Sequence, residues 1–340
     1  MTALTFEAAL SAADGKKHLL LGNGFSIALK PDIFTYGSLY ENANFTGVPY
    51  AREIFDALQT KDFEIIIKLL NDMAKIISIY QDGDLAVAQR LRQDAAAIKT
   101  ILVDTIASRH PDRPHQITPH QYAACREFLK NFDHYYTLNY DVLLYWTLMQ
   151  DEVDEWKPNH DDGFRAPEDN LDAPYVSWQS HNSSTVHYLH GALHLFDAGS
   201  EITKYTWART DIPIIDQIRQ ALDQEKYPIF VSEGSSASKQ KRILHNAYLH
   251  KALRSLGSIT GSVFVFGHSL DDNDRHIFKE IVKNTRIKAL YVSLYGDSDS
   301  VANSAIKRKS ELLATERAGH APTRPLSVSF YSAESAQVWG

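Results

Sequence analysis

The sequence predicts an α/β protein whose open, mostly parallel sheet is covered by helices on both faces. Short apolar runs alternate with helical patterns along the chain, as in parallel sheets joined by crossover helices. The apolar run His18–Leu21 passes through the glycine turn Gly22-Asn23-Gly24 directly into a helical pattern. Polar clusters also follow the ends of the predicted strands, where such sheets bind their ligands. Together these observations indicate a Rossmann-like fold.

Each element is expected from its hydrophobic period and the turn residues that flank it. Strands are expected over 18–21, 134–138, 185–189, 228–231, 263–266, 289–295 and 326–331, with a hairpin between 193 and 205. Helices are expected over 5–13, 25–29, 119–132, 142–149, 214–222, 239–256, 275–282 and 303–316. Apolar residues recur at helical spacing from 51 to 109, and the turn 81–84 divides them into an antiparallel pair. We therefore expect a single α/β domain over 1–340, with a helical insertion at 45–115 and an irregular excursion at 151–180.

The composition excludes several classes of protein. Of the 340 residues, 44% are hydrophobic and 23% are charged, as in ordinary globular proteins. The formal net charge of −7 argues against direct nucleic-acid binding, because such proteins present a basic face. No apolar run approaches the ~20 residues of a membrane helix, and residues 1–14 do not resemble a signal peptide. The single cysteine, Cys125, excludes a disulfide within the chain and fits the reducing cytoplasm, where we expect the protein.

The polar clusters are the main pointer to function. They cover 22–26, 139–141, 190–191, 232–236, 267–274 and 296–298, and each follows a predicted strand. The carboxyl ends of parallel strands meet at one edge of a sheet, so we expect these clusters to form a site there. Segment 232–236 is either a phosphate-facing loop or only a flexible turn. Segment 34–40 either covers the glycine turn or packs in the core through Phe34 and Leu39.

The sequence lacks the motifs of several common nucleotide-binding and catalytic sites. Ile27 stands where a dinucleotide-binding loop has its third small residue, and no Lys-Ser or Lys-Thr of a P-loop follows the glycines. A serine-hydrolase elbow is missing its last glycine at 267–271. His187, His190 and His194 lie close in sequence, but strand alternation turns His190 away from His187, so no metal site is expected.

A neutral amide, Asn139, and a histidine, His190, remain at adjacent strand ends beside the glycine turn. Such a pair can position a water molecule and take or share a proton at a sugar carbon. Glycines in the turn would let backbone N–H groups approach a phosphate, next to the favourable start of a helix. The sequence therefore predicts a nucleotide pocket.

Four motifs, in order, give the chain a resemblance to sirtuin-like domains. They are GNGFS at 22–26, TLNYD at 137–141, YLHG at 188–191 and FGHSLDDND at 266–274. In particular, the chain resembles the bacterial sirtuin-like NAD-hydrolase domains of anti-phage defence, in a branch that also has FTYGSLY at 34–40. The resemblance covers 19–297, and the helical insertion takes the position of the variable sirtuin small domain. It implies cleavage of the nicotinamide–ribose bond of NAD to give nicotinamide and ADP-ribose.

The resemblance also implies roles for the matching residues. Asn139 would orient the attacking water or the ribose, and His190 would act as a general base on the ribose hydroxyls. Asp141 would hold Asn139 in place. The residues expected to bind NAD are Gly22, Asn23, Gly24, Phe25, Ser26, Asp141, Gly267, His268, Ser269 and Asp274, with the first glycines and Ser26 at the phosphates and Gly267, Ser269 and Asp274 at the adenosine end.

The chain departs from the sirtuin pattern at three places. The cysteine pairs of the structural zinc module are absent, so NAD is expected as substrate without a metal cofactor. The Gly-Ile-Pro-Asp-Phe-Arg segment is replaced by 34–40, so deacetylation is not predicted, and Phe34 and Tyr36 are the candidates for nicotinamide contact. Asn23 stands where alanine is usual between the glycines.

Structural roles are the alternative for the same residues. Asn139 could cap the next helix, and His190 could be a buried histidine bonded to backbone. The alternative function is a non-catalytic sensor that binds NAD or ADP-ribose, or a partner module. The expected partners are NAD or ADP-ribose and a protein partner or second copy, with no membrane.

Charged residues near the polar clusters have simpler interpretations. Asp271 and Asp272 are expected to cap the helix that follows them. Lys239, Lys241 and Arg242 fit the solvated start of a helix.

Overall fold

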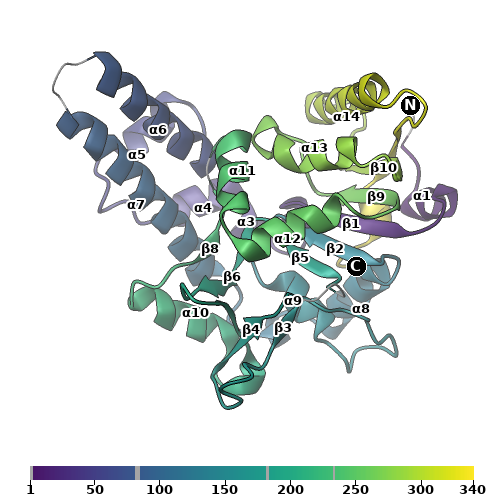
Figure 1. Cartoon of the computed structure of the whole chain (residues 1–340), viewed down its shortest axis with the longest axis horizontal. Helices are drawn as coiled ribbons and strands as arrows, with labels where there is room; N and C mark the ends of the chain where they lie inside the picture. The colour runs from purple at the N-terminus through teal and green to yellow at the C-terminus, as the bar shows by residue number, and fades with distance from the viewer. Residues whose placement is uncertain (1–2, 81–84, 181–183, 233) are drawn as a thin grey trace.

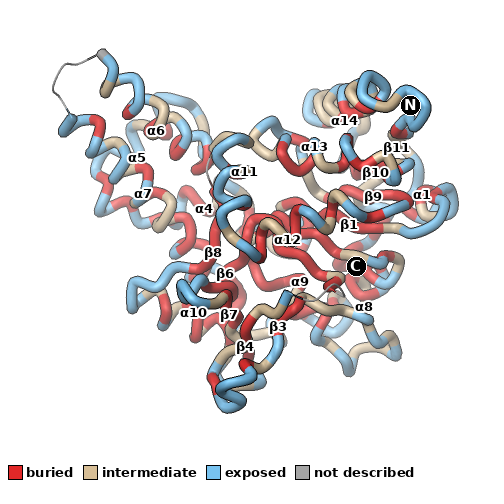
Figure 2. The backbone as a smooth tube through the Cα atoms, in the orientation of Figure 1, coloured by how far each residue is buried: buried red, intermediate tan, exposed pale blue. Residues whose placement is uncertain are grey.

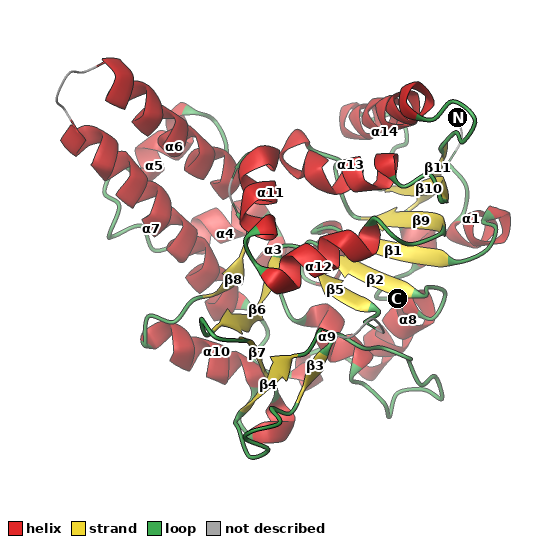
Figure 3. Cartoon of the chain, in the orientation of Figure 1, coloured by secondary structure: helices red, strands yellow, loops and turns green. Residues whose placement is uncertain are grey.

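The computed structural model describes residues 3–80, 85–180, 184–232 and 234–340, and within them it contains two β-sheets (Figures 1 and 3). The larger sheet has six strands in the order β11-β10-β9-β1-β2-β5, and all neighbours are parallel. Its strands are β1 (Lys17–Leu21), β2 (His134–Thr137), β5 (Val186–Tyr188), β9 (Gly261–Phe266), β10 (Ile287–Leu294) and β11 (Ser327–Ser332). The predicted α/β fold with a mostly parallel sheet is therefore confirmed.

Helices surround the sheets. They are α1 (Phe6–Ala12), α2 (Gly24–Leu29), α3 (Pro31–Phe34), α4 (Tyr36–Asn42), α5 (Ala51–Ala57), α6 (Phe63–Tyr80), α7 (Leu85–Arg109), α8 (Pro119–Leu129), α9 (Leu143–Leu148), α10 (Ile214–Asp223), α11 (Ser236–Leu244), α12 (Ala247–Leu256), α13 (Arg275–Lys283) and α14 (Val301–His320). No helix in the described part of the chain has the length and apolar character that crossing a membrane requires.

Successive tyrosines on β2 show that helices cover both faces of the parallel sheet. The Tyr135 hydroxyl donates to the Leu129 carbonyl at the end of α8, at 3.0 Å. The next residue, Tyr136, lies 2.9 Å from the Ser255 hydroxyl of α12, on the opposite face. Because side chains alternate along a strand, α8 and α12 lie on opposite sides of β2. The strands themselves are buried throughout the centre of the molecule (Figure 2).

The register brings the carboxyl ends of the central strands together. Leu21 at the end of β1 is paired with Thr137 on β2 and Phe266 on β9. Thr137 is in turn paired with Tyr188 on β5. The segments that follow β1, β2, β5 and β9 therefore begin side by side at one edge, as the sequence predicts.

The second sheet is antiparallel and has five strands in the order β3-β4-β7-β6-β8. It contains β3 (Phe164–Arg165), β4 (Tyr175–Trp178), β6 (Gly191–Asp197), β7 (Ile202–Tyr205) and β8 (Pro228–Phe230). The hairpin predicted at 193–205 is formed by β6 and β7. The segment 151–180, which was expected to be irregular, contributes β3 and β4.

The strand at 228–231 does not extend the parallel sheet, as its place in the α/β alternation had suggested. It forms β8 and pairs antiparallel with β6. The cause is the turn at Gly191, whose φ of +83° favours glycine and redirects the chain directly after β5. A Cβ atom at Gly191 would lie 2.0 Å from the Ile229 carbonyl oxygen, so glycine also permits this close pairing.

The helical pattern predicted from 51 to 109 forms three helices, α5, α6 and α7, in the described residues. Helices α6 and α7 pack together through buried apolar residues, including Ile66 and Leu70 on α6 and Ile98 and Leu102 on α7. The pair extends away from the two sheets (Figure 1). The turn predicted at 81–84 lies outside the described residues.

The helix predicted over 239–256 is divided into α11 and α12. Asn246 has an extended backbone, and its side chain accepts a hydrogen bond from the Leu249 amide at 3.1 Å. This is an N-cap, so a new helix begins after Asn246 in a different direction. The division leaves α11 beside α13 and α12 over β5.

The last residues of the chain pack against α2. The Trp339 indole N–H donates to the Phe25 carbonyl at 2.8 Å, and the two rings lie 5.0 Å apart. Phe25 is buried by this contact. The C-terminal segment therefore packs on the start of α2, the helix that follows the glycine turn.

Candidate functional site

The glycine turn after β1 packs directly on the turn after β9. The Gly22 amide donates to the Phe266 carbonyl at 2.9 Å, and the Gly24 amide donates to the Gly267 carbonyl at 2.8 Å. A Cβ atom at Gly22 would lie 2.6 Å from the Gly267 oxygen, and one at Gly24 would lie 2.5 Å from the Gly267 Cα. Close backbone approach is thus the reason for glycine at both positions.

This packing corrects the predicted phosphate contacts. The amides of Gly22 and Gly24 already donate to carbonyls of the β9 turn, so they are not available to cradle a phosphate. The next two amides are also engaged, because Phe25 donates to Gly22 and Ser26 donates to Asn23, each at 3.0 Å. The Phe25 ring faces the core rather than a ligand.

Asn23 connects the glycine turn to the segment 34–40. Its side-chain amide donates to the Phe34 carbonyl at 3.0 Å. Phe34 is buried, while Tyr36 at the start of α4 is half exposed. Burial of the phenol oxygen raises the pKa of Tyr36, and nearby carboxylates including Glu64 raise it further. Of the two nicotinamide candidates, Phe34 therefore belongs to the core, and only Tyr36 keeps part of its side chain exposed.

Asn139 is held by a buried chain of hydrogen bonds. Its side-chain amide donates to the Ser26 hydroxyl at 3.0 Å, and Ser26 donates to the Asp141 carboxylate at 2.5 Å. The other oxygen of Asp141 accepts from the Leu143 amide at 2.9 Å, in a turn that leads into α9. Burial raises the pKa of Asp141 despite these two bonds.

Two sequence predictions are thereby revised. Asp141 does hold Asn139 in place, but through Ser26 rather than directly. Ser26 donates its hydroxyl proton to a carboxylate and is fully buried, so it positions Asn139 instead of binding phosphate. Within the described residues no side chain caps α9, so the helix-capping role considered for Asn139 is not observed.

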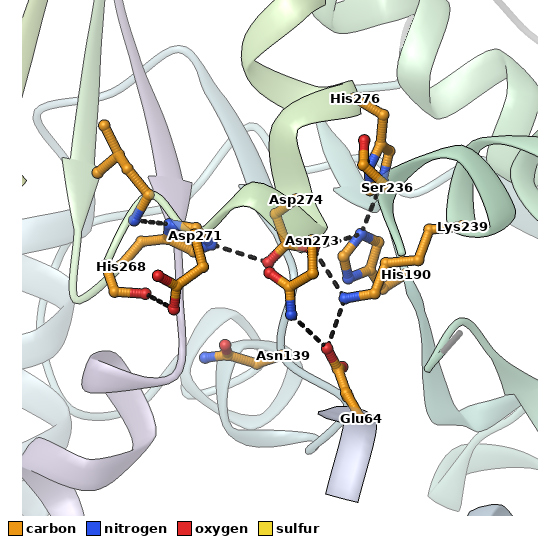
Figure 4. Close-up of polar contacts among 12 residues, drawn as sticks. Glu64, Asn139, His190, Ser236, Lys239, His268, Asp271, Asn273, Asp274 and His276 are labelled. Atoms are coloured by element: carbon orange, nitrogen blue, oxygen red, sulfur yellow. Dashed lines mark hydrogen bonds and ion pairs between the residues drawn. The ribbon is translucent and has the colours of Figure 1, made fainter. Parts of the chain in front are cut away.

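His190 follows β5 and lies in a cluster that other elements complete (Figure 4). Its Nε2 atom is 3.2 Å from Nε2 of His276 and 3.7 Å from Oδ1 of Asp274. His276 in turn places Nδ1 at 3.3 Å from the Ser236 hydroxyl. Burial lowers the pKa of His190 well below its usual value and that of His276 to about 4, so both rings are neutral near pH 7.

Lys239 links this cluster to the helical insertion. Its ammonium donates to Oδ1 of Asp274 at 2.8 Å and to Oε2 of Glu64 at 2.7 Å. Glu64 stands in the first turn of α6 and also accepts from Asn273 at 2.8 Å and from Tyr140 at 3.2 Å. The insertion therefore contributes a carboxylate to the edge of the parallel sheet.

Burial and the neighbouring charges shift the pKa values of the groups in this network. Burial raises the pKa of Glu64 to about 7, although Lys239 opposes that shift. Burial acts in the same direction on Asp274, but His190, His268 and Lys239 outweigh it and hold the pKa of that carboxyl low. Lys239 loses solvent, yet its two carboxylate partners raise its pKa, so it stays charged. It is not part of a solvated helix start, as the sequence had suggested.

The turn after β9 is organised around Asp274 and Asp271. His268 lies 3.0 Å from the second oxygen of Asp274 and accepts from the Leu270 amide at 2.8 Å. Ser269 donates to Asp271 at 2.5 Å. Asp271 also pairs with Lys309, and its side chain does not cap the following helix.

The remaining polar clusters lie apart from this network or are only partly in it. Ser235 caps α11 by accepting from the Ser238 amide at 3.2 Å, and Ser236 reaches His276. The segment 296–298 instead holds the start of α14, where Asn303 donates to the Asp297 carbonyl at 2.7 Å. Four of the six predicted clusters therefore lie at the site, namely 22–26, 139–141, 190–191 and 267–274. The fifth, 232–236, contributes Ser236 at the start of α11.

Figure 4 draws Asn139 near the His190 cluster without a polar contact between them. Each side chain belongs to a separate hydrogen-bonded network at the same sheet edge. His187 and His194 do not join either one, since His187 is bonded to Ser255 at 3.0 Å and His194 is buried beside Tyr188.

The fold and site define an α/β protein with a buried histidine–carboxylate–lysine cluster at the carboxyl edge of a parallel sheet. Residues 19–339 match the model of the family described as a domain of unknown function, DUF4917, so the chain belongs to that family. A search of the curated proteins finds no match.

Proposed function

We propose that this protein cleaves the nicotinamide–ribose bond of NAD, releasing nicotinamide and ADP-ribose. The observation that carries the proposal is the position of Asn139 and His190 after the neighbouring parallel strands β2 and β5. Ligands of open α/β sheets bind at this edge. The sirtuin-like order of the four motifs supports NAD as the nucleotide.

The two residues have complementary parts in the proposed reaction. Water attacks C1′ of the ribose, the bond from C1′ to the pyridinium nitrogen breaks, and neutral nicotinamide leaves with the bonding electrons. Asn139, fixed by Ser26, orients the water or the ribose. His190 is neutral and can accept a proton from a ribose hydroxyl, and its neighbour Asp274 stabilises the resulting imidazolium.

The test is a measurement of nicotinamide release from NAD by purified protein. Asn139→Ala and His190→Ala should each lower the rate by about 10²–10⁴-fold, as expected when a positioned acid–base or orienting group is lost. His115→Ala, at an exposed histidine outside both networks, serves as the control and should keep the wild-type rate. Turnover that survives unchanged in both site variants would refute the proposal.

A sensor that binds NAD or ADP-ribose without turnover is the second candidate, and Glu64 favours it. This side chain connects the site to α6, so occupation of the site has a direct contact through which to alter the helical pair. Calorimetric binding of ADP-ribose with no nicotinamide release would support the sensor. Nicotinamide release by the isolated protein would exclude it.

A further inference from the structure

Three side chains beside Lys239 have the geometry of a metal-binding site. His190, Asp274 and His276 each offer one ligand atom, and these atoms all lie within 4.8 Å of one another. The two histidine nitrogens are 3.2 Å apart, and Oδ1 of Asp274 is 3.7 Å from His190. Ligand atoms at the bond lengths of a tetrahedral Zn²⁺ ion lie about 3.3–3.4 Å from one another. Rotation of the three side chains toward one another would therefore accommodate an ion.

The surroundings orient these atoms in the manner of metal ligands. Nδ1 of His276 contacts the Ser236 hydroxyl at 3.3 Å, which leaves Nε2 directed at the centre of the cluster. The second oxygen of Asp274 is held by His268 at 3.0 Å. Such outer contacts fix the tautomer and direction of ligating side chains. They also distinguish the cluster from an accidental group of acidic residues.

Charge and access are compatible with a divalent ion. With both carboxyls ionised and the histidines neutral, Lys239, Glu64 and Asp274 have a formal sum of one negative charge. The ammonium donates to Oδ1 of Asp274 at 2.8 Å, so an ion bound to that oxygen would replace the ammonium there, and Glu64 would still hold the lysine at 2.7 Å (Figure 4). The Asp274 side chain is 13% exposed, whereas both histidines are buried, so an ion would enter past Asp274.

We propose that His190, Asp274 and His276 bind a divalent transition-metal ion, with Zn²⁺ as the best fit, leaving a fourth position open. Two imidazoles and one carboxylate favour transition metals over Mg²⁺, which prefers oxygen ligands. The binding itself is independent of the proposed function. Its consequence rests on that function, because an ion on His190 would compete with the ribose and inhibit NAD cleavage.

Co²⁺ is a suitable probe, since its visible absorption reports coordination geometry without any enzymatic assay. Protein without an affinity tag is treated with chelator, dialysed and titrated with Co²⁺. We expect a single tight equivalent with tetrahedral absorption bands, which Zn²⁺ displaces and Mg²⁺ does not. Absence of that spectrum in the wild-type protein would overturn the proposal, whether or not the protein cleaves NAD.

Variants locate the ion. His276→Ala should abolish the tight Co²⁺ spectrum, and Ser236→Ala should weaken affinity by about 10–100-fold, as is typical for loss of an outer contact. Ser236 lies at the partly exposed start of α11, so this variant keeps the proposal testable if His276→Ala unfolds, as judged by circular dichroism. His115→Ala should bind like wild type. Equal weakening in His115→Ala, or full affinity in both site variants, would contradict the assignment.

Discussion

Lys239 gives the sharpest test of how the site is held together. The variant Lys239→Met keeps the aliphatic stem, so its packing at 1% exposure is largely preserved, but it removes the ammonium. Two carboxylate contacts, at 2.7 Å to Glu64 and 2.8 Å to Asp274, are lost together. Removing one partner of a buried ion pair costs about 3–5 kcal/mol, because the remaining charge has no compensation. We expect the free energy of unfolding to fall by that amount.

Urea denaturation measures this loss, and a double-mutant cycle assigns it. Glu64→Gln removes one of the carboxylates, so combining it with Lys239→Met should be less damaging than the sum of both changes, by about 1–3 kcal/mol. Lys68→Met is the matched control on α6, since its pair with Asp72 is exposed and should contribute less than about 0.5 kcal/mol. A loss below 1 kcal/mol for Lys239→Met, or additivity with Glu64→Gln, would refute this account of the network.

Two further predictions concern the supports of the site. His110 bonds to Pro111 and Val142 through its two ring nitrogens, and burial lowers its pKa from 6.5 to about 4. As pH falls from 6.5 toward 4, the unfolded chain binds this proton and the folded protein does not, so the free energy of unfolding falls by about 3 kcal/mol over that range. Urea denaturation of His110→Gln should therefore show a shallower dependence of stability on pH. An unchanged pH dependence would contradict this prediction. Gly24→Ala should lower the free energy of unfolding by about 1–3 kcal/mol, because its Cβ would meet backbone rather than a movable side chain. Gly47→Ala is the control, because its Cβ meets nothing within 4 Å and the substitution should leave the melting temperature unchanged. Thermal melts compare the two variants, and equal melting temperatures would show that the β9 turn moves to make room for the Cβ at position 24.

The centre of the parallel sheet could be predicted because β1, β2 and β9 are buried and are each followed by a helical pattern. β9 is apolar or small along its whole length, which is typical of a central parallel strand. β8 has the same apolar character over three residues, yet it belongs to the other sheet. Only the direction of the chain after Gly191 separates the two cases, and that direction depends on tertiary contacts.

The candidate site was partly predictable for a related reason. Asn139 and His190 are placed at adjacent strand ends by topology, which the order of elements along the chain indicates. Glu64 and Lys239 are 175 residues apart and meet only in the folded protein. Each belongs to a helical pattern whose charged residues are usually solvated, so neither position carried a signal of burial.

The contact between Trp339 and Phe25 has a consequence for how the protein is made. The two residues are separated by 314 positions, and β1 lies between β2 and β9, which are both synthesised after it. The strand β1 is therefore synthesised before both of its neighbours in the sheet. The helix α2 gains its contact with Trp339 only after that residue has been synthesised. Proteins dominated by such distant contacts fold slowly. We expect β1 and α2 to remain without these contacts until the residues that supply them have been synthesised.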